Sequence, residues 1–154
     1  MSTLKKLIYN LNTISNIPRG RRVRTTGDLI SIDEDTPLQG LWRWISSEGR
    51  DRTVKFICNE IRYAILLSKY MMAAISATIN AAERDELCSD LKALMESLNR
   101  TPAGIENICW TYKNDTQVEW NMDNLKNEIS DCLARIRECL AAVSLNAPNL
   151  AEEK

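Results

Sequence analysis

The sequence predicts an all-α fold: a bundle of four to six mostly antiparallel helices with a long central helix at about 51–82 and an irregular N-terminal arm. Three observations support this class. The 154 residues include only five glycines and four prolines, too few for a turn-rich β-fold. Apolar residues recur at alternating spacings of four and three, the period of an amphipathic helix. The Thr-Pro pairs at 36–37 and 101–102 are typical helix starts, because the first helical turn leaves its N–H groups unbonded.

The N-terminal part of the chain predicts two short helices separated by an irregular segment. Residues 3–15 place their apolar side chains on one face, and Pro18 ends this helix. Residues 16–36 show no helical period. A second helix begins at Pro37, and we expect Gly49 to break it, since glycine is a poor helix former.

The longest predicted helix spans 51–82. Its apolar series has a single polar member, Ser68. Residues 64–82 carry one charge, Lys69, so a membrane span is an alternative. A lysine near the middle of a bilayer costs about 2.5–3.5 kcal/mol, and further polar residues interrupt the run. We therefore expect this helix at the centre of the bundle and not in a membrane.

Three more helices are expected, at about 83–99, 101–112 and 116–145. The last begins with a capping box, in which Thr116 and Glu119 each bond a free backbone N–H of the first turn. Its apolar stripe comprises Val118, Met122, Leu125, Ile129, Cys132, Ile136, Cys139 and Val143. Helices with such stripes pack at shallow angles, as in bundles.

These elements predict three parts of the chain. Residues 1–35 hold the first helix and the arm, 36–146 form the helical bundle domain, and 147–154 form a flexible tail. Short connections between the bundle helices predict antiparallel neighbours.

The composition indicates that the chain is not an enzyme. Histidine is absent, which removes the usual general base and the commonest metal ligand. No glycine-rich phosphate loop is present. Carboxylates at helical spacing, such as Glu119 with Asp123 and Glu128 with Asp131, are interpreted as a solvated helix face, with a divalent-metal site as the alternative. We expect no catalytic residue, no cofactor and no metal.

The five cysteines are interpreted as reduced, buried thiols that pack as small hydrophobes. None forms a CxxC pair, and an odd number cannot all pair within one chain. An alternative interpretation of Cys109, which lies beside Trp110, is a reactive thiol. No base or cation is evident near it in the sequence. Reduced thiols indicate a cytoplasmic location, and a nuclear location stays open.

An arginine-rich arm is the strongest signal for a partner. Its four guanidinium groups belong to Arg19, Arg21, Arg22 and Arg24, and the first 27 residues carry six basic and no acidic side chains. Such an arm binds the phosphates of nucleic acid, a protein or lipid partner, or the acidic surface of its own chain, and these alternatives stay open.

Trp42, Arg43 and Trp44 form a second candidate contact. Side chains two residues apart on a helix point about 200° apart, so both indoles do not face one core. Either one indole is exposed as a contact residue beside Arg43, or both are buried between the arm and the bundle.

The sequence thus predicts a non-enzymatic interaction or assembly protein that self-associates as a homo-oligomer. It contacts a protein partner through Arg19, Arg21, Arg22, Arg24, Trp42, Arg43 and Trp44. The alternative is a nucleic-acid-coating subunit, of the packaging or nucleocapsid type, with the arm along the phosphate backbone.

Overall fold

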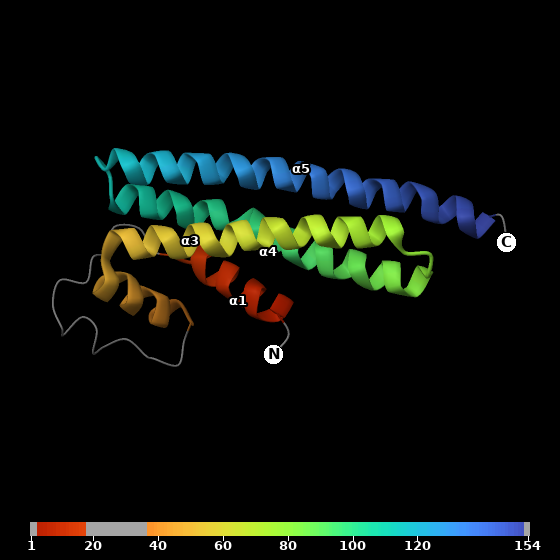
Figure 1. The fold of residues 1–154 in the computed structure, drawn as a ribbon, viewed down its shortest axis with the longest axis horizontal. Coiled ribbons are helices and arrows are strands. Elements are labelled where there is room, and N and C mark those ends of the chain that lie inside the picture. The colour runs from red at the N-terminus through yellow and green to blue at the C-terminus, as the bar shows by residue number, and fades with distance from the viewer. Residues whose placement is uncertain (1–2, 18–36, 153–154) are drawn as a thin grey trace.

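The computed structural model describes the backbone of residues 3–17 and 37–152, and the side chains of residues 3–17 and 53–145. The described residues form four α-helices and no strand, which confirms the predicted all-α bundle. These helices are α1 (Thr3–Ser15), α3 (Pro37–Ala77), α4 (Ala81–Thr111) and α5 (Thr116–Glu152). Figure 1 shows α1, the main part of α3, α4 and α5 running in alternating directions, and the first part of α3 turned back sharply against its main part.

The helices α3 and α4 share the central position of the bundle. They pack against each other, and each also contacts α1 and α5. In Figure 1, α5 runs along one side of this pair and α1 along the other. The prediction of one central helix is therefore incomplete, because α4 is as central as α3.

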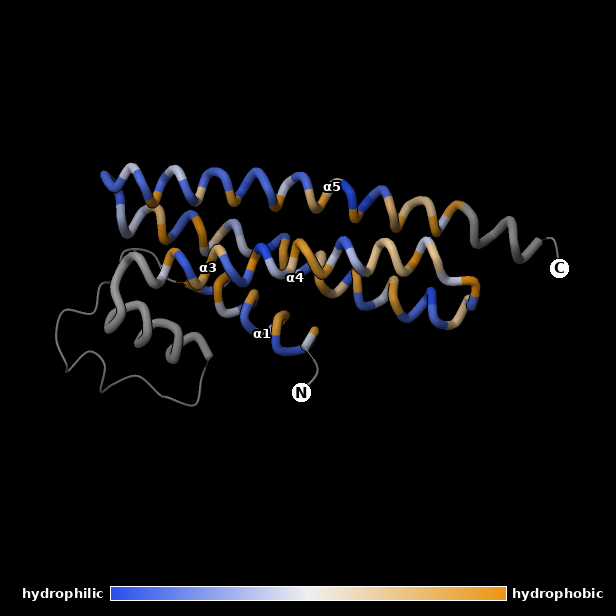
Figure 2. The backbone as a smooth tube through the Cα atoms, in the orientation of Figure 1, coloured by the Kyte–Doolittle hydropathy of each residue, from blue (hydrophilic) through white to orange (hydrophobic). Residues whose placement is uncertain are grey.

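The core lies where the apolar stripes of these helices meet. Its largest fully buried side chains are Leu11, Ile14, Ile17, Ile57, Ile61, Leu91, Leu94, Leu98, Ile105, Ile108, Met122 and Leu125. Each contributes about 1.5–3 kcal/mol through burial, so this core is the main stabilising term. Figure 2 shows hydrophobic residues recurring at intervals along α4 and α5, whereas they dominate the second half of α3. No described helix is apolar over a stretch long enough to cross a bilayer.

Ser68, the polar member of the α3 series, lies at the contact between α3 and α5. It is fully buried, and its hydroxyl donates to the carbonyl of Ile65 at 2.6 Å. Its Oγ also shares a hydrogen bond with the Sγ of Cys132 on α5, and the two atoms are 3.2 Å apart. The hydroxyl is thus satisfied inside the core, as burial of a polar group requires.

The structure corrects both predicted ends of the long helix. A break at Gly49 is wrong, because α3 is continuous from Pro37 to Ala77. One glycine lowers helix stability by only about 1 kcal/mol relative to alanine, so a single glycine does not by itself end a helix of 41 residues. The end at residue 82 is also wrong, since Asn80 caps α4 by accepting from the backbone N–H of Glu83 at 3.1 Å.

A second correction concerns Thr101-Pro102, which does not start a new helix. The helix α4 passes through Pro102, whose missing N–H leaves the carbonyl of Leu98 without its helical donor. The hydroxyl of Thr101 donates to that carbonyl at 2.7 Å and replaces the lost bond. The Thr101-Pro102 pair therefore does not begin a helix, because the Thr101 side chain supplies the hydrogen bond that Pro102 lacks.

The ends of α5 also differ from prediction. Asp115 caps the helix in place of the expected Thr116–Glu119 box, because its Oδ1 accepts from the backbone N–H groups of Gln117 and Val118, both at 3.1 Å. Asn114 before it has a φ of 77°, a left-handed conformation that asparagine tolerates in turns. The helix α5 continues to Glu152, so the backbone of 147–152 is helical, and the flexibility of this tail stays a prediction from the sequence.

Gly104 lets the end of α1 touch α4. A Cβ at this position would lie 1.8 Å from the carbonyl oxygen of Ile14, far inside contact distance. Nearby, Asn107 donates to the carbonyl of Ile17 at 2.7 Å, and Arg100 donates to the side chain of Asn12 at 3.0 Å. Only glycine allows the two backbones to approach this closely.

We expect Gly104→Ala to destabilise the fold by about 1–3 kcal/mol, since the added methyl group must displace the α1 backbone. The measurement is chemical denaturation followed by circular dichroism. On an unobstructed helix the same change stabilises by about 1 kcal/mol, so a rise in stability would show that α1 does not pack here.

Candidate functional site

The predicted contact residues fall outside the part of the chain whose side chains are described. Arg19, Arg21, Arg22 and Arg24 lie in a segment that the structure does not describe. Trp42, Arg43 and Trp44 belong to the backbone of α3, but their side chains are also outside the described set. Their roles therefore stay predictions from the sequence.

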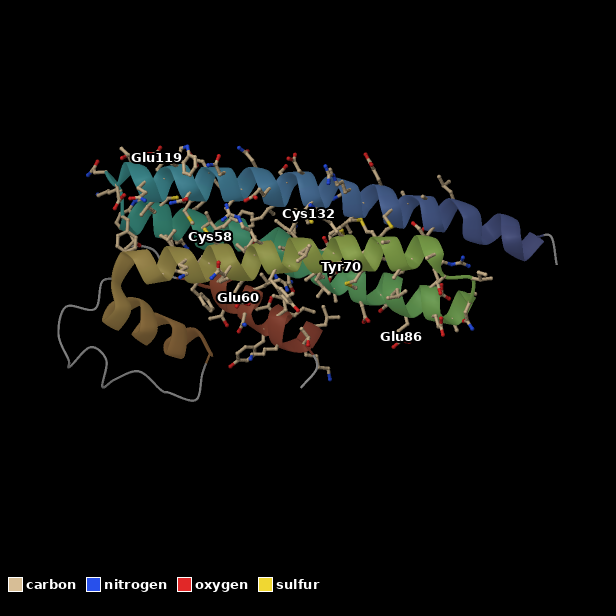
Figure 3. The ribbon with its side chains drawn as sticks, in the orientation of Figure 1. Cys58, Glu60, Tyr70, Glu86, Glu119 and Cys132 are labelled. Carbon is tan, nitrogen blue, oxygen red and sulfur yellow. The ribbon has the colours of Figure 1, made fainter. Side chains whose placement is uncertain are left out.

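The described residues instead present an exposed, uncharged and mostly apolar stripe on α3. Tyr63, Leu66 and Tyr70 are 45%, 48% and 67% exposed. With Asn59, Ala73 and Ala77, which are also exposed, they recur at spacings of four and three and contain no charged side chain. We name these six residues the α3 outer stripe. Figure 3 shows Tyr70 on this helix.

The α3 outer stripe lies opposite the face that α3 buries. The buried series runs through Ile61, Ala64, Ser68, Met71 and Ile75, and each buried position lies two residues before a stripe position. A step of two residues turns a helix by about 200°, so one series faces the core while the other faces away. Contiguous exposed apolar surface of this kind marks interaction sites.

Basic side chains flank the stripe. Lys55, Arg62 and Lys69 are exposed and recur every seven residues, so they form one row along α3. Arg62 donates from Nε to Glu128 of α5 at 3.2 Å, and both side chains are about half exposed. An exposed pair of this kind adds at most about 1 kcal/mol.

On the neighbouring α1, Lys5, Lys6 and Tyr9 are exposed. The packing places α1 beside α3, where Asn10 donates to Glu60 at 3.1 Å. The α3 side chain that meets α1 here is thus acidic, whereas the basic row of α3 lies toward α5, where Arg62 pairs with Glu128.

A hollow of about 400 Å³ lies between α4 and α5 near their connecting turn. Its lining includes Glu106, Glu119 and Asp123, and Figure 3 labels Glu119 near the start of α5. Lys126 bridges two of these carboxylates, hydrogen-bonding Glu106 and lying 3.6 Å from Asp123. The bond to Glu106 raises the pKa of the Lys126 ammonium, which therefore stays charged.

An indole forms part of the same hollow. Trp110 is 44% exposed, and the ammonium of Lys113 lies 4.9 Å from the centre of its ring. A cation over an indole face is favourable by about 0.5–1 kcal/mol at an exposed site. Trp120, 67% exposed, follows Glu119 on α5.

A second hollow, of about 310 Å³, lies between α3 and α5. Val54, Cys58 and Val118 supply its apolar part, and Lys55 and Arg62 supply its cations. No carboxylate lines it, so the two hollows differ in charge.

The thiols and carboxylates do not converge on a reactive centre in the described part of the chain. Burial raises the pKa of every thiol: Cys58, Cys88, Cys109, Cys132 and Cys139. All are free, two of them buried and three half-buried, so the prediction of five buried thiols holds only for Cys58 and Cys132. Among the described residues, no three acidic or thiol side chains are grouped to hold a metal ion.

Sequence reasoning missed the three large side chains of the α3 outer stripe. Tyr63, Leu66 and Tyr70 lie within a run that was interpreted as apolar on all sides because it forms the centre of the bundle. The sequence does contain a signal for a helix with one buried and one exposed face. It is a second series of uncharged residues with the same spacing as the core series, displaced from it by two residues.

No protein-family model, curated protein or solved structure matches this chain. The properties that point to a function are therefore those of its own surface: an uncharged stripe, a basic flank and an acidic hollow.

We expect all five thiols to react more slowly than free cysteine at pH 7.5, because a raised pKa lowers the thiolate fraction. Cys88, Cys109 and Cys139 should be alkylated before Cys58 and Cys132, which are buried. Pulsed alkylation read by mass spectrometry checks this order. Rapid labelling of Cys58 or Cys132 in the folded protein would contradict the core packing described above.

Proposed function

We propose that this chain is a non-enzymatic helical assembly protein that self-associates through the α3 outer stripe. The observation that carries the proposal is that α3 has two apolar faces while its own bundle covers only one. The second face is uncharged for about 27 Å along the helix, at 1.5 Å per residue. Tyrosine, which supplies two of its members, is enriched at protein interfaces.

A second copy of the chain is the occupant that we propose for this surface. Covering the exposed parts of Tyr63, Leu66 and Tyr70 contributes about 1 kcal/mol for each side chain. Association costs about 4–15 kcal/mol in lost freedom, so the stripe alone does not hold two copies together. Charged and aromatic residues around it must add to the contact.

The proposal includes the sequence-predicted contacts. Arg19, Arg21, Arg22 and Arg24 supply a basic contact to an anionic partner, and Trp42 and Trp44 with Arg43 supply a second contact. Both roles rest on residue type and spacing alone.

A nucleic-acid-coating subunit is the second candidate. The observation that favours it is that exposed tyrosines of α3 directly follow exposed basic residues, Tyr63 after Arg62 and Tyr70 after Lys69. Aromatic rings stack on bases, and lysines contact phosphates. Copurifying nucleic acid, released between about 50 and 500 mM salt, favours this candidate over the first, because phosphate contacts weaken steeply with salt.

We expect the double variant Tyr63→Glu with Tyr70→Glu to lower the molar mass of the wild-type assembly toward that of the monomer. Association would remove water from the two new carboxylates in the stripe, which is unfavourable. The substitutions also remove most of the apolar surface that a second copy would bury. Size-exclusion chromatography with light scattering on untagged protein measures this change.

Leu145→Glu is the matched control, because Leu145 is 72% exposed and lies outside the stripe. It should assemble as the wild type does. A wild-type protein that stays monomeric at high concentration would refute self-association, and an unchanged mass in the double variant would remove the stripe from the interface.

A further inference from the structure

We propose that the hollow between α3 and α5 is a binding site for a small organic phosphate monoester, with Lys55 and Arg62 as its cations. The hollow has a volume of about 310 Å³, within the range of small-ligand sites. All of its lining residues come from one copy of the chain, so this inference does not depend on the proposed self-association. The lining offers cations, neutral hydrogen-bond donors and an apolar surface, which match the parts of such a ligand.

The two cations set the charge of the hollow. Lys55 and Arg62 are exposed and lie seven residues apart, which is about two turns along one side of α3. Among the described residues no carboxylate lines the hollow, so its lining carries two positive charges. A phosphate monoester carries about −1.5 to −2 at neutral pH and balances both cations, whereas a carboxylate balances only one.

Arg62 has donors for a ligand although it already pairs with α5. Its Nε donates to Glu128 at 3.2 Å, and Glu128 is not among the residues that line the hollow. A guanidinium has five N–H donors in a planar fork, and the bond to Glu128 uses one of them. Burial raises the pKa of the Cys58 thiol in this hollow, and the positive charge of Arg62 opposes the rise. The guanidinium charge therefore acts inside the hollow as well as on Glu128.

Three carboxamides add neutral donors to the same lining. Asn59 lies four residues after Lys55 and three before Arg62, so it shares their side of α3. From α5 the hollow receives Gln117 and Asn121. Asn121 donates to the backbone carbonyl of Gln117 at 3.0 Å, which uses one of the two N–H donors of its amide. Phosphate oxygens accept several charge-assisted hydrogen bonds at once, so cations and amides can bind one group together.

The apolar part of the lining favours an organic phosphate over the inorganic ion. Cys58, labelled in Figure 3, and Val118 are buried, and Val54 is half-buried. Each methylene group that a ligand buries against these side chains strengthens binding by up to about fourfold. The hollow between α4 and α5 differs in this respect, because Glu106, Glu119 and Asp123 line it and their carboxylates repel a phosphate.

The test is a titration of the full-length protein at pH 7.5 with n-butyl phosphate, inorganic phosphate and butanoate. NMR follows the side-chain NH₂ signals of Asn59, Gln117 and Asn121, which report on the hollow directly. We expect saturable shifts of these signals with n-butyl phosphate. It should bind at least about fivefold more tightly than inorganic phosphate, because of its apolar chain, and more tightly than butanoate, which carries less charge.

Lys55→Gln and Arg62→Gln are the test variants, and Lys69→Gln is the matched control. Lys69 belongs to the same basic row of α3 but does not line the hollow, and each substitution removes one positive charge. We expect each test variant to raise the dissociation constant for n-butyl phosphate by at least about tenfold, since it loses charge-assisted hydrogen bonds. Lys69→Gln should change it by less than about twofold. Circular dichroism and thermal melting establish that all three variants are folded.

The outcomes separate a binding site from general attraction of anions to α3. Shifts that do not saturate, or equal losses in Lys69→Gln and the two test variants, would overturn the site. Equal affinity for n-butyl phosphate and inorganic phosphate would overturn its assignment to an organic ligand. A short single-stranded oligonucleotide that displaces n-butyl phosphate at a lower concentration would assign these cations to nucleic acid instead. A wild-type protein that stays monomeric refutes the proposed self-association and leaves this inference standing, because the titration reads one hollow of one copy.

Discussion

Burial of one apolar stripe each from α3, α4 and α5 is the constraint on which the rest of the structure depends. The three helices contact one another pairwise, so each directs one face inward and its other faces elsewhere. For α3 the inward face is the series that includes Ser68, whose hydroxyl is satisfied by Ile65 and Cys132. Once that face is buried, a residue two positions along points outward, and Tyr63, Leu66 and Tyr70 remain on the surface.

Helix packing also decides which charged and polar side chains meet. Gly104 lets the α1 backbone lie against α4, and the contact of α1 with α3 brings Asn10 to Glu60. The basic row of α3 lies toward α5, where Arg62 pairs with Glu128. Exposed pairs of this kind add little to folding stability, because exposed charges interact weakly.

The sequence predicted the helices better than it predicted their ends. The first helix was expected at residues 3–15 and is Thr3–Ser15. The helix ends predicted at Gly49 and at Thr101-Pro102 are wrong. Glycine and proline lower helix stability by about 1–3 kcal/mol, and other interactions offset this cost. At Pro102 the offset is visible, since the Thr101 hydroxyl replaces the missing donor to Leu98. Such a bond depends on a side-chain rotamer that residue spacing does not specify.

The all-α class, the absence of histidine chemistry and the apolar stripes all follow from the order of residues, because helical period and residue type are local properties. The α3 series that includes Ser68 is predicted to face the core and does so, but only packing decides that Tyr63, Leu66 and Tyr70 on the opposite face stay exposed. The same holds for the ion pairs between helices. Arg62 and Glu128 become neighbours only when α3 packs beside α5, and Lys126 and Glu106 only when α4 packs beside α5. The surface that distinguishes this protein is therefore a product of helix packing, which brings together residues that no sequence interval relates.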